Sequence, residues 1–162
     1  MTKNLVVYYS FEGHTKHIAD VIAHEINADI LRIKPVKEMK SKGFGKYFWG
    51  GAQVYMKKIP TLEPFDIDFD IYDSVFLGSP IWAFTITPPI KSFLLGDYLK
   101  DKDIYFFYTH DGGPGKVESI ARKLIEKENR LLSTQSIINK KNGTEEIDQQ
   151  VINWVHSLEL DK

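Results

Sequence analysis

The stretch "LVVYYSFEGHTKHIADVIAHEIN" at residues 5–27 contains the features that decide the fold. It begins with five consecutive strand formers, a run typical of a strand buried on both faces of a parallel sheet. A short polar loop follows, and then Ile18, Ile22 and Ile26 recur at helical spacing. The pattern predicts a strand over residues 5–9 and a helix over residues 14–27, joined by a loop rich in hydroxyl groups and glycine.

The same alternation of strand and helix continues along the chain. Strands that alternate with helices indicate an α/β fold with a parallel sheet, and right-handed crossovers leave few topologies. We therefore predict a doubly wound three-layer sandwich with a five-stranded parallel sheet and about five helices. The further strands are expected over residues 28–33, 74–77, 104–109 and 131–138, and the further helices from Pro88 onward and over residues 116–129 and 144–159.

The segment between the second and third predicted strands is long for a crossover connection. A helix over residues 43–58 is predicted by apolar residues four apart, which are Phe44, Phe48, Ala52 and Met56. Four glycines in the same segment weaken this prediction. The alternating stretch "FDIDFDIYD" at residues 65–73 has the period of a strand. Its four aspartates disfavour a strand, so we predict an acidic turn there.

Composition narrows the class of protein. The chain has 162 residues, 43% of them hydrophobic, which predicts one domain over residues 1–162. It has no cysteine, which excludes disulfides, thiolate metal ligands and thiol catalysis from this chain. The net charge of −1 gives no indication of nucleic-acid binding. With no signal pattern and no membrane-spanning apolar run, we expect a cytoplasmic protein without membrane association.

The loop "SFEGHT" at residues 10–15 has the composition of a phosphate cradle. Gly13 permits a sharp turn or a close approach to a ligand, and Ser10 and Thr15 offer hydroxyl donors. The helix that follows offers free N–H groups and a favourable dipole, although the lysine of a P-loop is missing. The alternative is that Thr15 only caps the helix.

Two more strand ends open into unusual loops. In "GSPIWAFTITPP" (residues 78–89), Trp82 and Phe84 follow a strand, where they could form a wall for a planar ligand. The alternative is a partly buried loop tryptophan. In "THDGGPGK" (residues 109–116), the glycines allow backbone amides to face a ligand, and the alternative is an ordinary connection. Ligands of open α/β sheets bind at such strand ends.

Through most of its length the chain resembles the flavodoxin family, on the motifs "VVYYSFEGHTKHIADVIA", "FLGSPIWAFTITPPIKSFL" and "FYTHDGGPGK". The resemblance implies strand order 2-1-3-4-5 with FMN as the cofactor. It also implies three groups of cofactor-binding residues, with Trp82 as the preferred stacking residue. These are Ser10, Phe11, Glu12, Gly13, His14 and Thr15 at the phosphate, Pro80, Ile81, Trp82, Ala83 and Phe84 beside the isoalloxazine ring, and Thr109, His110, Asp111, Gly112 and Gly113 along its other edge.

The leading functional hypothesis is an FMN-binding electron-transfer protein. It would be a monomer or homodimer that exchanges electrons with redox partner proteins or small oxidants, with no catalytic side chain and no metal. The alternative is an NAD(P)H-dependent flavin or quinone reductase. The near-neutral charge favours that alternative, since typical flavodoxins are strongly acidic. The aromatic residues of the segment at residues 43–58 favour it as well. A third possibility, a module that has lost its cofactor, is opposed by the intact loops. No glycine follows Trp82, which is a departure from long-studied flavodoxins.

Overall fold

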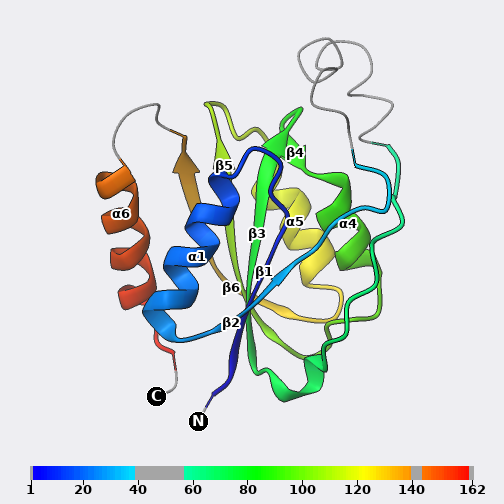
Figure 1. The fold of residues 1–162 in the computed structure, drawn as a ribbon, viewed down its shortest axis with the longest axis horizontal. Coiled ribbons are helices and arrows are strands. Elements are labelled where there is room, and N and C mark those ends of the chain that lie inside the picture. The colour runs from blue at the N-terminus through cyan, green and yellow to red at the C-terminus, as the bar shows by residue number, and fades with distance from the viewer. Residues whose placement is uncertain (1, 39–56, 140–143, 161–162) are drawn as a thin grey trace.

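A twisted sheet forms the middle of the molecule, and helices cover both of its faces (Figure 1). The computed structural model describes residues 2–38, 57–139 and 144–160. Along the chain its elements are β1 (Asn4–Tyr8), α1 (His14–Ile26), β2 (Asp29–Arg32), the 3₁₀ helix η2 (Phe69–Ile71), β3 (Ser74–Trp82), β4 (Thr85–Ile86), α4 (Pro88–Leu95), β5 (Asp103–His110), α5 (Val117–Ile125), β6 (Arg130–Ile138) and α6 (Thr144–Ser157).

The strand order is β2-β1-β3-β5-β6, and each neighbouring pair is parallel. This confirms the expected order, with β3, β5 and β6 as the third, fourth and fifth predicted strands. One strand end is a correction. The third strand was predicted to end at Leu77, but β3 continues to Trp82. Residues 78–80 continue the parallel pairing with β5. β4 then folds back as an antiparallel hairpin that pairs Ile81 with Ile86 and Trp82 with Thr85.

The side chains of β1 alternate between two apolar layers. Leu5 and Val7 pack into the layer beneath α4 and α5, while Val6 and Tyr8 pack into the layer beneath α1 and α6. This is the two-sided burial that the apolar run predicted. The helical stripe of α5 is confirmed as well, since Val117, Ala121 and Ile125 are buried.

The acidic segment before β3 forms a turn, as predicted. Its centre is the short helix η2, and the Asp68 carboxylate accepts a hydrogen bond of 3.0 Å from the Asp70 N–H. The helix expected over residues 43–58 falls, up to residue 56, outside the described residues. Among the helices that are described, none combines the length and the apolar character needed to cross a membrane.

Substitution of Gly78 tests how tightly the centre of the sheet is packed. A Cβ at this position would lie 2.2 Å from Cζ of the fully buried Phe107. We expect Gly78→Ala to lower the unfolding free energy by about 1–3 kcal/mol in urea denaturation, the usual cost of overpacking a core.

Gly96→Ala is the matched control for this substitution. Its Cβ would lie 2.3 Å from the Tyr98 ring, but that ring is 39% exposed and is therefore less confined than the Phe107 ring. A loss for Gly78→Ala no larger than that for Gly96→Ala would show that the Phe107 ring is not fixed.

Candidate functional site

The carboxyl ends of β1, β3 and β5 bring the three predicted loops together at one edge of the sheet. A small cavity of about 80 Å³ lies between them. It is lined by Ser10, Phe11, Glu12, His14, Thr15, Pro80, Ile81, Trp82, Thr109, His110, Asp111 and Asn139. The other predicted residues, Gly13, Ala83, Phe84, Gly112 and Gly113, belong to the same loops but do not line this cavity.

The first loop turns at Gly13 and leads directly into α1. Gly13 has a left-handed backbone (φ 102°), and its N–H donates to Ser10 Oγ at 3.2 Å. No side chain caps the helix and no acidic residue stands in its first turn. The first N–H groups of α1 therefore have no partner within the helix, and they carry the positive end of its dipole. This end of the cavity suits an anion.

Thr15 links the first loop to the third. It is the second residue of α1, its side chain is buried, and its Oγ1 lies 2.9 Å from Oγ1 of Thr109. The alternative that Thr15 only caps the helix is wrong, because Gly13 occupies the cap position. The paired hydroxyls of Thr15 and Thr109 instead stand beside the open helix terminus and give it two further donors or acceptors.

The second loop is a hairpin of two residues between β3 and β4. Ala83 (φ 47°) and Phe84 (φ 63°) are both left-handed, as in a type I′ turn, where glycine and asparagine are usual. A left-handed residue other than glycine costs roughly 1–2 kcal/mol, so the hairpin is strained. The tip carries Phe84 with 66% of its surface exposed.

Trp82 lies elsewhere than the sequence suggested. It was expected beyond the strand end, but it is the last residue of β3 and is only 8% exposed. Its ring meets those of Tyr9 and Phe11 edge-on, each with ring centroids 5.7 Å apart. The buried Trp82 ring therefore supports the hairpin from the core, and the exposed aromatic side chain of the hairpin is Phe84.

The glycines of the third loop serve the backbone and the hairpin. Gly112, Gly113 and Gly115 all have positive φ. A Cβ on Gly115 would lie 2.5 Å from the Phe84 Cβ and 3.0 Å from the Phe84 carbonyl oxygen. Gly115 is therefore required by close contact with the hairpin, and the second and third loops pack as one unit.

His110 has a buried polar side chain at the start of the third loop. Its Nε2 lies 2.8 Å from Ser136 Oγ, the residue is 5% exposed, and its Nδ1 has no hydrogen-bond partner among the described residues. Burial lowers the pKa of His110, against an opposite influence from Asp111, so the neutral imidazole is favoured. The Tyr108 ring stacks on the His110 ring, with the two ring centroids 5.8 Å apart.

Asn139 is a lining residue that the sequence reasoning missed. Its N–H donates to the His110 carbonyl at 2.8 Å, and its Nδ2 donates to Asp111 Oδ1 at 3.0 Å. Asn139 directly follows β6, so its position after a parallel strand was the available signal. Within the part of the chain that the structure describes, no three His, Cys, Asp or Glu side chains gather in positions that could hold a metal ion.

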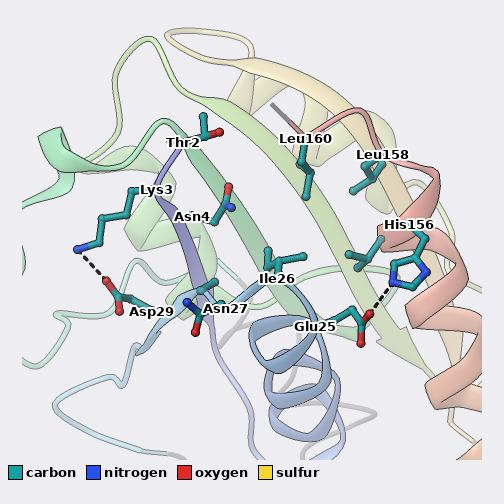
Figure 2. Close-up of a pocket in the computed structure, with 12 residues that line it drawn as sticks. Thr2, Lys3, Asn4, Glu25, Ile26, Asn27, Asp29, His156, Leu158 and Leu160 are labelled. Carbon is teal, nitrogen blue, oxygen red and sulfur yellow. Dashed lines mark hydrogen bonds and ion pairs between the residues drawn. The ribbon is translucent and has the colours of Figure 1, made fainter. Parts of the chain in front are cut away.

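A larger cavity of about 940 Å³ lies at the opposite end of the sheet, beside the last turns of α1 and α6 (Figure 2). Its charged groups already pair with one another, Lys3 with Asp29 and His156 with Glu25. The carboxyl ends of two helices point their negative dipole ends toward this region. It lies away from the strand ends where α/β proteins bind ligands, and it is poorly suited to a phosphate.

The residues at the loop edge fit a phosphorylated aromatic ligand. The open terminus of α1 and the Thr15–Thr109 hydroxyls suit a phosphate, and the buried Nδ1 of His110 is open to a hydrogen-bond partner from a ligand. A cavity of about 80 Å³ holds several water molecules, which is enough for a phosphate but not for a nucleotide. A ring system would therefore lie along the surrounding surface, toward the exposed Phe84.

The fold and this edge define a doubly wound α/β protein with a ligand site at its topological switch point. The chain matches the model of the flavodoxin family over residues 3–158 and belongs to that family. No curated protein shows significant similarity to it.

Several solved structures share the fold. A protein assigned as a flavoprotein from Bacteroides uniformis has 19% identity and a TM-score of 0.82, covering 96% of this chain and 99% of that one. A flavoprotein in complex with FMN from Lactobacillus acidophilus has 24% identity and a TM-score of 0.71, covering 84% and 93%. The two-electron reduced flavodoxin from Megasphaera elsdenii has 15% identity and a TM-score of 0.59, covering 96% and 99%.

Burial of neutral His110 makes stability depend on pH. Its pKa is lowered in the fold, so the unfolded chain takes up a proton near the ordinary value of 6.5 while the folded chain resists it. The unfolding free energy should therefore fall as the pH drops through 6.5. We expect His110→Gln to remove part of this fall between about pH 7.5 and 5.5 in urea denaturation.

His24→Gln is the control for this prediction, because His24 is an exposed residue of α1. Comparison with wild type cancels the carboxylates and the other histidines. Parallel losses of stability in wild type and His110→Gln would show that His110 does not carry the effect.

Proposed function

We propose that this protein binds FMN at the carboxyl edge of its sheet and works as an electron-transfer protein. The observation that carries the proposal is the Thr15–Thr109 hydroxyl pair beside the uncapped N-terminus of α1, at the same edge of the sheet as a hairpin with an exposed aromatic side chain. The FMN complex of the Lactobacillus acidophilus flavoprotein, which shares the fold, supports the choice of cofactor.

The phosphate would be held by neutral donors. The N–H groups at the start of α1 and the hydroxyls of Ser10 and Thr15 can all donate to phosphate oxygens. Ser10 is buried and its Oγ already accepts from the Gly13 N–H, which fixes the hydroxyl in place. The Arg32 guanidinium donates to the Ser10 carbonyl at 2.9 Å and adds positive charge near this loop.

The ring would be held by the hairpin and the third loop. Phe84 offers an exposed face for stacking, while the buried Trp82 packs against Phe11 and holds the hairpin to the core. The bound flavin supplies the redox chemistry, and the protein's part is to bind it, orient it and tune it. An exposed aromatic tip beside the ring also gives a redox partner protein a direct approach.

The near-neutral charge keeps the NAD(P)H-dependent reductase as the second candidate. A carrier that docks on positively charged partners is usually acidic, and this chain has a net charge of −1. The electron-transfer proposal therefore favours a partner recognised through apolar contact at the hairpin rather than through charge.

Thr15→Ala tests the phosphate end of the proposed site. Loss of one hydrogen bond to a charged group should weaken FMN binding by about 1–3 kcal/mol. Riboflavin has no phosphate, so its binding should change much less. Both affinities can be measured by quenching of flavin fluorescence.

Thr109→Val is the comparison variant, because it removes the hydroxyl partner of Thr15 but keeps the shape of the side chain. A smaller loss of FMN binding than in Thr15→Ala would assign the phosphate contact to Thr15. Equal losses for FMN and riboflavin would mean that Thr15 acts only in the structure. A wild-type protein that does not bind FMN at all would overturn the cofactor proposal.

Anaerobic mixing with NADPH or NADH separates the two candidate functions. For an electron-transfer protein, we expect the flavin absorbance to persist after mixing and to bleach only when a separate flavoprotein reductase is added. Riboflavin-loaded buffer without protein controls for direct reaction of the nucleotide. Rapid bleaching by NADPH or NADH alone would replace the electron carrier by the reductase.

A further inference from the structure

The last residue of β2 is attached to the loop that follows β1. Arg32 is the register partner of Tyr8, and the Ile33 N–H donates to the Tyr8 carbonyl at 2.9 Å, so the ends of the two strands lie side by side. Tyr8 packs into the layer beneath α1 and α6, and register partners on parallel strands point to the same face of a sheet. The Arg32 side chain is therefore on the α1 face, where its Nη2 donates to the Ser10 carbonyl at 2.9 Å.

Ser10 connects this arginine to the small cavity. Ser10 is buried and lines the cavity, and its Oγ accepts from the Gly13 N–H directly before α1. Its carbonyl oxygen accepts from Arg32. Because the carbonyl and the hydroxyl belong to one residue, the guanidinium lies within about 10 Å of an anion bound at the hydroxyl, a separation no larger than the Debye length at 0.1 M salt.

The positive charge of Arg32 has no carboxylate partner among the described residues. The chain has two other arginines. Arg122 forms an ion pair with Glu126, and Arg130 forms one with Asp103. Arg32 differs from both, since its hydrogen bond goes to a neutral backbone carbonyl. Its charge is therefore not cancelled within the described part of the chain, and it lies beside a loop that suits an anion.

The charges around the cavity show why an anion needs this arginine. Two lining residues, Glu12 and Asp111, carry carboxylates that oppose a phosphate. Lys16 of α1 is already paired with Asp20. The N-terminus of a helix supplies only about half an elementary charge, whereas a phosphate monoester carries about −1.5 to −2 at neutral pH. The full charge of Arg32 offsets the repulsion by the carboxylates.

We propose that Arg32 is the specificity residue that selects a phosphorylated flavin over an unphosphorylated one, through its charge rather than through direct contact. The proposal rests on the proposed function, because it takes the flavin phosphate as the anion at this loop. The neutral donors of the loop form the hydrogen bonds to the phosphate, and Arg32 makes their surroundings positive. A residue of β2, outside the three loops and outside the cavity lining, thereby acts on the site.

The ratio of the affinities for FMN and riboflavin measures this selection. In low salt, Arg32→Gln should weaken FMN binding about three- to tenfold, as expected for one charge interaction across a partly solvated loop, and should leave riboflavin binding nearly unchanged. Arg32→Lys keeps the charge without the planar fork and should keep most of the ratio. Equal losses for both ligands in Arg32→Gln would overturn the proposal. So would a ratio in Arg32→Lys as low as in Arg32→Gln, because the loss would then come from the hydrogen bond to Ser10.

Salt dependence separates the charge of Arg32 from its effect on the shape of the loop. Arg32 is exposed, so added salt screens its charge. The FMN affinities of wild type and Arg32→Gln should therefore converge as KCl is raised to about 0.5 M. A difference between the two proteins that salt leaves unchanged would show that Arg32 acts by holding the loop and would overturn the charge role.

Arg130→Gln is the matched control, because it removes the same charge at the start of β6, at the opposite end of the sheet. It should leave the ratio of FMN to riboflavin affinity unchanged. A fall as large as in Arg32→Gln would mean that the net charge of the protein sets the ratio, and the proposal would fail.

A titration without flavin distinguishes failure of this inference from failure of the proposed function. If wild type binds neither FMN nor riboflavin, the proposed function is refuted. Inorganic phosphate added to the ¹⁵N-labelled protein then decides the role of Arg32. A shift of the Gly13 amide signal in wild type that is much smaller in Arg32→Gln would support Arg32 as the charge that attracts phosphate to this loop. No shift in wild type, or the same shift in both proteins, would overturn that role as well.

Discussion

The site depends on the position of β1 between β2 and β3, where the strand order reverses. β1 pairs in parallel with β2 on one side and β3 on the other, so the chain leaves it in one direction and returns in the other. Right-handed crossovers then place α1 on one face and α4 and α5 on the opposite face. The carboxyl end of β1 opens between the two helical layers. The glycine and hydroxyl residues after Tyr8 lie in that gap, where no further strand or helix of the described residues covers them.

Close packing holds the second and third loops in position beside this gap, and it maintains a strained hairpin there. The hairpin keeps two left-handed residues, Ala83 and Phe84, although neither is glycine. Such strain persists only where the surroundings over-determine it, and it concentrates at functional sites. Here the surroundings make two contacts with the hairpin. The Trp82 ring meets the Phe11 ring edge-on, and Gly115 approaches Phe84 closely. The exposed ring of Phe84 is thus presented from a rigid support.

Local patterns were enough to predict the order of the elements along the chain, and the three loops that they indicated at strand ends supply most of the residues that line the small cavity. The apolar run of β1, the stripe of α5 and the glycine loop at residues 111–115 each depend on neighbours in sequence. The extension of β3 could not be predicted in this way. It requires antiparallel pairing through a tight turn, and the turn residues Ala83 and Phe84 lack the usual glycine or asparagine signal.

Long-range contacts explain the other differences. Thr15 looked like a helix cap because hydroxyl residues often cap helices, but its partner is Thr109, 94 residues away. Asn139 joins the site through His110 and Asp111, and nothing beside it in the sequence indicates either contact. The contact of His110 with Ser136 was invisible for the same reason, since the two residues lie on neighbouring strands and are 26 residues apart.

The unsatisfied atom of His110 has an energetic consequence. A buried polar group without a hydrogen-bond partner costs about 1–3 kcal/mol. Among the described residues, His110 Nδ1 is a buried atom without such a partner, and His110 lies where β5 reaches the cavity. The cost is therefore concentrated at a residue that a ligand can reach. A ligand that forms a hydrogen bond with this atom recovers the cost on binding, which couples ligand affinity to the stability of the β5–β6 edge.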